Sequence, residues 1–291
     1  MNEQENGLSR RRLLQKAAFG GSAVMLGGTL AGCGGFLGDD DTGTGNRATD
    51  ADVLNFALNL EYLEAEYYLI GTQGRRLNNS DIGTGADAVT GGNQVTFATQ
   101  RIKDYADEIT ADEEAHVKFL RAALGGAAVP RPAINLRESF NALALAAGLG
   151  SSFDPFANEV NFMIGAFIFE DVGVTAYKGA APLISNKTFL EAAAGILAVE
   201  AYHAGNVRNL LLELGQQSVT QAVSDLRDNL DGAGDKDQGI ELGGRANIVP
   251  TDSNGIAFSR STREVLNIVY GQVNAAQGLF FPNGLNGTIR A

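Results

Sequence analysis

Both histidines of this 291-residue chain follow a glutamate at the same spacing. Glu113 precedes His116 by three positions, and Glu200 precedes His203 by three positions. Residues three apart on an α-helix lie on the same face, with their Cβ atoms about 5–6 Å apart. A carboxylate and an imidazole placed in this way can bind one metal ion, although a single Glu-x-x-His pair is more often an exposed ion pair on a helix surface.

Two further glutamates repeat a second pattern. Tyr68 follows Glu61 by seven residues, and Tyr177 follows Glu170 by seven residues. The chain order is therefore Glu…Tyr, Glu-x-x-His, Glu…Tyr, Glu-x-x-His, which indicates a helical hairpin used twice. Four carboxylates in an apolar interior would be very costly without partners, whereas two divalent cations would neutralise them. The doubled pattern therefore favours a dinuclear metal site over two unrelated surface ion pairs.

Other glutamates compete for the ligand positions. Glu64 and Glu66 are alternatives to Glu61 from the same segment, and Glu64 shares the helix face of Glu61. Glu114 lies off the face of His116 and is expected to be solvated. Two tyrosines at these positions, taken alone, are more often ordinary core residues.

The residue types narrow the choice of metal. Ligands that are rich in carboxylate with some imidazole favour iron or manganese over a thiolate-bound metal. Cys33 is the only cysteine, which excludes an intramolecular disulfide and a thiolate cluster. No HExxH, P-loop, GxSxG or dinucleotide fingerprint occurs between a plausible strand and helix.

Composition predicts an all-α protein. The chain has 44% hydrophobic residues, no tryptophan and only six prolines. Helical spacing of apolar residues, bounded by capping residues or glycines, marks several segments. These segments are residues 50–71, 95–124, 154–179, 186–214, 217–230 and 261–271.

The connections predict how four of these helices are joined. A Gly-rich loop at residues 72–94 and a short link around Pro182 should each close an antiparallel hairpin. The link at residues 126–153 is much longer. A 30-residue helix spans about 45 Å, and 28 extended residues reach about 90 Å, so this link can cross the bundle from end to end. That is the topology of a ferritin-like four-helix bundle with one long crossover.

The N-terminal region has the features of an export signal. Residues 1–32 combine the twin arginine pattern Ser-Arg-Arg-x-Leu-Leu with a short apolar run, and this pattern is typical of a twin-arginine signal peptide. Leu30-Ala31-Gly32-Cys33 resembles a lipobox, in which Cys33 becomes the lipidated first residue. A plain signal peptide with an incidental cysteine is the alternative. We therefore expect an exported, lipid-anchored protein of the cell envelope whose partner is a membrane surface.

The remaining chain divides into three parts. Residues 33–48 are a flexible tether rich in Gly and Asp. Residues 49–215 form the expected bundle, and residues 216–291 form an extension of short helices and loops packed on it. The formal net charge of −12 argues against nucleic acid as a partner.

Three stretches of this sequence resemble one family. They are NFALNLEYLEAEYYLIG at residues 55–71, the two Glu-x-x-His helices, and NIVPTDSNGIAFSRSTREVLNIVYG at residues 247–271. Together they are similar to exported ferritin-like-domain proteins related to plant desiccation-associated proteins. The resemblance implies two Fe or Mn ions and the following site residues: Glu61 and His116 on one metal, Glu170 and His203 on the other, Glu113 and Glu200 as bridges, and Tyr68 and Tyr177 as hydrogen-bond donors to the carboxylates.

The resemblance also implies a function. A dinuclear centre of this kind reacts with oxygen or peroxide, either by oxidising iron, as a ferroxidase does, or by dismuting peroxide, as a manganese catalase does. The alternative is a non-catalytic envelope or desiccation protein in which the metals only hold the helices together. The expected lipid tether, the Gly-rich loop and the tail argue against a closed multi-subunit cage, while a smaller homo-oligomer stays open.

Overall fold

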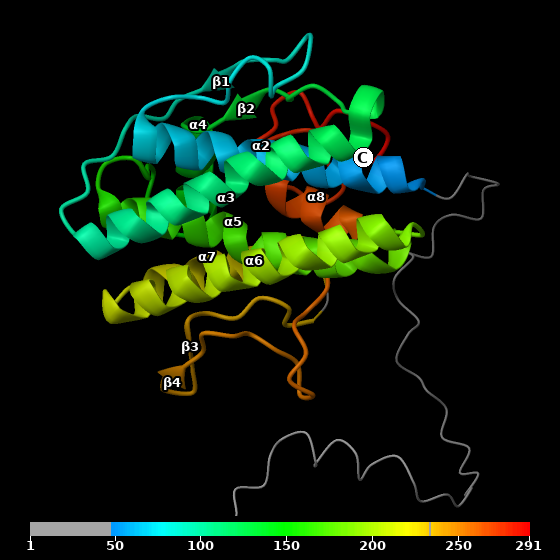
Figure 1. Cartoon of the computed structure of the whole chain (residues 1–291). Coiled ribbons are helices and arrows are strands. Elements are labelled where there is room, and N and C mark those ends of the chain that lie inside the picture. Colours follow the sequence, from blue (N-terminus) through cyan, green and yellow to red (C-terminus); the bar gives the residue numbers. More distant parts are fainter. Residues whose placement is uncertain (1–47, 233) are drawn as a thin grey trace, which may run out of the picture. The chain divides into compact units, whose positions relative to one another are not determined.

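Four long helices, arranged as two hairpins, form the centre of the computed structural model shown in Figure 1. The structure describes residues 48–232 and 234–291. The signal sequence, the lipobox with Cys33 and nearly all of the tether lie outside these residues. The described helices are α2 (Asp50–Gln73), α3 (Gln100–Leu124), α4 (Glu138–Ala146), α5 (Glu159–Ala180), α6 (Lys187–Glu213), α7 (Gln217–Asp231) and α8 (Thr262–Tyr270), with 3-10 turns η1 (Gly125–Ala127) and η2 (Ala181–Leu183).

The first hairpin pairs α2 with α3, and the second pairs α5 with α6. Near the start of α2, Asn55 donates a hydrogen bond to the carbonyl of Ala127, which lies just beyond the end of α3. Near its end, Gly71 accepts a hydrogen bond from the backbone of Val95. These contacts show that α2 and α3 are antiparallel. The sequence predicted this arrangement.

The crossover between the hairpins runs the length of the bundle. It leaves α3 beside the start of α2 and enters α5 where Phe162 stacks on Tyr67, close to the end of α2. On the way it forms β2 (Ile134–Asn135), which pairs in parallel with β1 (Val89–Thr90) of the Gly-rich loop, and then α4. The all-α bundle with one long crossover is therefore confirmed, and α4 is an element that the sequence analysis missed.

Two predicted helix starts were too early. The second helix begins at Gln100 rather than at residue 95, because the Glu159 carboxylate accepts hydrogen bonds from the backbone amides of Ala98 and Thr99 and holds this segment extended. The third begins at Glu159 rather than at residue 154. Asn158 caps it by accepting a hydrogen bond from the amide of Asn161.

The sequence suggested that the first helix ends at Gly71, but α2 does not end there. The helix continues to Gln73, and Gly74, with φ of +64°, provides the left-handed C-cap. A Cβ atom on Gly71 would lie 2.1 Å from the ring of Phe162. The glycine therefore serves the close approach of α5 and not the termination of the helix.

The central helices α2 and α5 are buried on almost every side. On their inner side they pack against the rest of the bundle, and on the other side they are covered by α4, α8 and the C-terminal tail, where Phe280 contacts Phe140 and Phe169. Residues Glu159–Leu183 are long and apolar enough to cross a membrane, but 83% of their most apolar window is buried inside the protein, as in a core helix. By contrast, α3 and α6 each keep one exposed face.

A buried network of arginines and aspartates joins the extension to the bundle. Arg208 of α6 and Arg227 of α7 share the carboxylate of Asp171 on α5. Asp237 is in turn shared by Arg227 and Arg260, and Arg260 also pairs with Asp231. Between these residues the chain forms a small antiparallel hairpin of β3 (Glu241–Leu242) and β4 (Arg245–Ala246). Because each charge is paired, the network can remain in the interior.

Candidate metal centre

The doubled pattern converges at one level of the bundle. Each long helix brings its part to the same interior: Glu61 from α2, Glu113 and His116 from α3, Glu170 from α5, and Glu200 and His203 from α6. All six side chains are buried, the four carboxylates to 1% exposure or less. The two Glu-x-x-His pairs are therefore not exposed ion pairs, and the structure brings all six candidate residues together.

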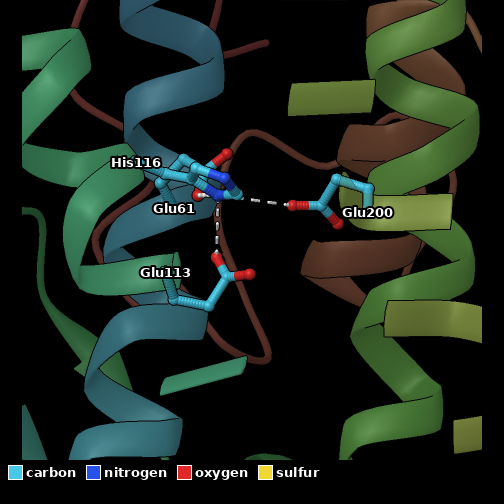
Figure 2. A group of neighbouring side chains, drawn as sticks. All are labelled: Glu61, Glu113, His116 and Glu200. Carbon is cyan, nitrogen blue, oxygen red and sulfur yellow. Dashed lines mark hydrogen bonds and ion pairs between the residues drawn. The ribbon is translucent and has the colours of Figure 1, made fainter. Parts of the chain in front are cut away.

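The first group surrounds His116 (Figure 2). The Nδ1 atom of His116 lies 3.2 Å from Glu61 Oε2, 3.6 Å from Glu113 Oε2 and 3.8 Å from Glu200 Oε1. One candidate ligand atom from each of these four residues lies within 4.8 Å of the other three. Four atoms of this kind can hold one metal ion.

The second group surrounds His203. The Nδ1 atom of His203 lies 3.1 Å from Glu113 Oε1 and 3.5 Å from Glu170 Oε2. Glu113 therefore belongs to both groups, with Oε2 turned to one histidine and Oε1 to the other. Of the two glutamates that the resemblance named as bridges, Glu113 has the shared position, whereas Glu200 belongs to the first group only.

The tyrosines connect the two hairpins. Tyr68 on α2 donates a hydrogen bond to Glu170 Oε1 on α5, and Tyr177 on α5 donates one to Glu61 Oε1 on α2. Each tyrosine thus fixes a carboxylate of the other hairpin. Hydrogen bonds of this kind orient metal ligands, which is the role that the resemblance implied for both residues.

Several buried polar atoms at this point have no hydrogen-bond partner. They are both oxygens of Glu113, both oxygens of Glu200, Glu170 Oε2 and His203 Nδ1. Such atoms are rare in folded proteins, and each one requires an explanation. Unpartnered carboxylate oxygens and an imidazole nitrogen that face one another are the donor set that a divalent iron or manganese ion accepts. The residues present therefore fit a metal-binding site.

The pKa values show how protons neutralise the centre in the metal-free chain. Burial raises the pKa of Glu61 to about 7. Burial alone lowers the pKa of each histidine, but nearby carboxylates outweigh it and raise the pKa of His116 to about 10 and of His203 to about 12. For Glu113, the effect of burial is outweighed by the two histidines, which hold its pKa well below its usual range. The metal-free site is thus occupied by protons that a metal ion must displace.

Glu64 is buried beside the centre but belongs to neither group. Its carboxylate faces the region of Gly173 on α5, where a Cβ atom would lie 3.6 Å from Glu64 Oε1 and only 2.3 Å from Glu200 Oε2. The pKa values of Glu64 and Glu200 both lie well above the usual range. Burial is the largest cause, and the negative charges of nearby carboxylates raise both pKa values further. A side chain at Gly173 would displace the Glu200 carboxylate.

The other competing glutamates point elsewhere. Glu66 forms a buried ion pair with Arg131, and Glu114 pairs with Arg75 and Lys118 toward the surface.

One residue of the site was not found from the sequence. Asp112 on α3 contacts His203 Nε2 through Oδ2 at 3.1 Å. No spacing indicates this contact, because it joins two helices that are distant in the sequence.

Comparison with known proteins agrees with this fold and site. A family model described as a ferritin-like domain matches residues 49–213, more than half of the chain. The chain therefore belongs to the family of proteins with a ferritin-like domain.

Two relatives match far beyond the four helices. A desiccation-related protein of Craterostigma plantagineum is 29% identical over 242 residues, which cover 75% of this chain and 76% of that protein. A ferritin-like catalase of Nesocodon mauritianus is 29% identical over 267 residues, which cover 82% of this chain and 84% of that protein. The resemblance seen in the sequence is thus confirmed, and the buried cluster fits a di-metal protein.

Proposed function

We propose that this protein binds two iron or manganese ions between its helical hairpins and uses them to dismute hydrogen peroxide. The observation that carries the proposal is the shared position of Glu113, which faces both histidines with different oxygens. Two adjacent groups joined by one carboxylate are suited to a pair of ions rather than to a single ion. The similarity to a protein named as a ferritin-like catalase supports peroxide as the substrate.

The side chains would divide the work as follows. Glu61, Glu113, His116 and Glu200 would hold one ion, and Glu113, Glu170 and His203 would hold the other. When bound, such a pair of ions supplies two-electron redox chemistry and Lewis acidity. Dismutation turns two molecules of peroxide into two of water and one of dioxygen, so protons must move between oxygens.

Metal analysis and a peroxide assay test this function together. Protein isolated from its native host is expected to contain about two Fe or Mn ions per chain. Loaded protein should release dioxygen from hydrogen peroxide, and chelated protein should not, until the metal is restored. Oxidation of ferrous iron without peroxide turnover would favour the ferroxidase alternative. Native material with no iron or manganese would contradict the proposal.

We further propose that the protein is exported and anchored to a membrane surface by a lipid on Cys33. The support is the lipobox-like sequence and the absence of any other cysteine in the chain. Wild-type protein should sediment with membranes, whereas Cys33→Ser should be recovered in the soluble fraction or keep residues 1–32. Mass spectrometry of the N-terminal peptide checks the modification. A Cys33→Ser protein that has lost residues 1–32 and still sediments with membranes would rule out this anchor.

A further inference from the structure

A groove between α3 and α6 opens next to the candidate metal centre. Its volume is about 300 Å³, and its wall includes Glu108, Asp112, Tyr202 and His203. Helices α3 and α6 are neighbours in the bundle (Figure 1), and each keeps an exposed face, although residues 236–250 of the extension contact part of α6. The groove therefore brings solvent to the side of the centre formed by His203.

One imidazole connects the groove to the centre. His203 is only 3% exposed, and its two nitrogens face opposite ways. Nε2 contacts the Asp112 carboxylate, whose side chain is 44% exposed, whereas Nδ1 faces Glu113 and Glu170 inside. An ion that reaches Asp112 is thus separated from the interior ligands by a single side chain.

The second histidine has no such connection. Asp112 of α3 and Val199 of α6 occupy matching positions, each four residues before the histidine of its own helix. His203 therefore has a carboxylate from the facing helix, whereas the matching residue for His116 is a valine. In the part of the chain that the structure describes, no hydrogen bond reaches Nε2 of His116. The two hairpins therefore differ in charge at this position. The acidic residue, Asp112, is present only on the side of the groove.

A second cavity beside the centre is too small for this purpose. Glu64 lines a cavity of about 20 Å³ among apolar side chains such as Leu60 and Phe280. That volume holds about one water molecule, so a hydrated metal ion does not fit. The groove has room for an ion with its water, and its wall has two carboxylates and no lysine or arginine. In both its volume and the charge of its wall, the groove is better suited to the passage of a cation than this cavity.

We propose that this groove is the route by which divalent metal ions enter the centre, with Glu108 attracting them at the mouth and Asp112 receiving them beside His203. The proposal rests on the proposed metal centre. Carboxylates that line an entrance raise the local concentration of cations and speed their association, and salt screens this effect. The rate of metal uptake should therefore depend on Glu108, while the final metal content should not, because Glu108 belongs to neither ligand group.

The test measures uptake of Co²⁺ by the metal-free full chain, followed by absorbance after rapid mixing. Glu108→Lys should slow uptake by about tenfold at low salt, and the difference from wild type should shrink at high salt. Glu191→Lys is the matched control, because it changes the net charge equally at an exposed position of α6 outside the groove. Final cobalt content and thermal midpoint should be equal in all three proteins.

The possible results separate the route from the centre. Equal uptake rates for Glu108→Lys and Glu191→Lys would overturn the entrance, even if both proteins fill with cobalt. A wild-type protein that binds no Co²⁺, Fe²⁺ or Mn²⁺ at equilibrium would overturn the metal centre itself, and the entrance with it. Asp112→Asn is a second test variant, because the substitution removes the inner carboxylate without adding bulk. The rate of Co²⁺ uptake should be lower in this variant as well.

Discussion

Replacing Glu113 with glutamine is expected to reduce the metal content from about two ions per chain to nearly none. Glu113 is the one candidate ligand that belongs to both groups of described residues. One of its oxygens faces His116 and the other faces His203. An amide has one oxygen and one NH₂ group, so the substitution removes a ligand atom and the negative charge that both ions require. Elemental analysis of Glu113→Gln protein after loading with manganese or iron measures the result.

Two neighbouring glutamates serve as controls. Glu114→Gln should keep both ions, because Glu114 pairs with Arg75 and Lys118 away from the centre. Glu64→Gln should also keep them, whereas Glu61→Gln should lose one. If Glu113→Gln retained both ions while Glu64→Gln lost them, the ligand assignment on α2 and α3 would be wrong.

The second large effect concerns stability. Arg260→Met is expected to lower the free energy of unfolding by about 3–5 kcal/mol, because it leaves Asp231 and Asp237 buried with a charge partner removed. Arg260 also donates a hydrogen bond to Thr175 Oγ1 of α5, so the substitution loosens the extension from the bundle. Urea denaturation followed by circular dichroism measures the change.

An exposed arginine provides the comparison. Arg101 pairs with Glu213 on the surface, and Arg101→Met should cost less than about 1 kcal/mol. Arg260→Lys should fall between the two, since it keeps the charge but not the forked geometry that reaches both aspartates. Equal stability of the Arg260→Met and Arg101→Met proteins would show that the buried network does not hold the extension.

The sequence revealed the centre because its signal is local. A glutamate three residues before a histidine faces the same way on any helix, so Glu113 and Glu200 could be placed beside their histidines before the fold was known. The seven-residue spacing likewise brought Tyr68 and Tyr177 into the candidate site. The bundle and its crossover followed from segment lengths, which depend little on detailed packing.

What the sequence did not reveal depends on contacts between distant segments. The start of α3 is set by Glu159, some 60 positions away, and no local pattern contains that information. The burial of α2 on almost every side likewise depends on α4, α8 and the C-terminal tail, which are distant in the sequence. The contact of Asp112 with His203 and the ion pairs of Arg260 are of the same kind, since each forms only when remote helices pack together.

The exchange of tyrosines between the hairpins has a consequence for when metal can be acquired. Tyr68 holds the Glu170 carboxylate, and Tyr177 holds that of Glu61, so each half of the chain arranges the ligands of the other. A chain with only its first hairpin formed has Glu113 but lacks His203, and therefore lacks the second binding position. Full loading of the proposed centre would require both halves to be docked in register. For the proposed centre, the amount of bound metal would therefore count the molecules that have completed folding, and a metal assay would double as a quality measure for a preparation of this protein.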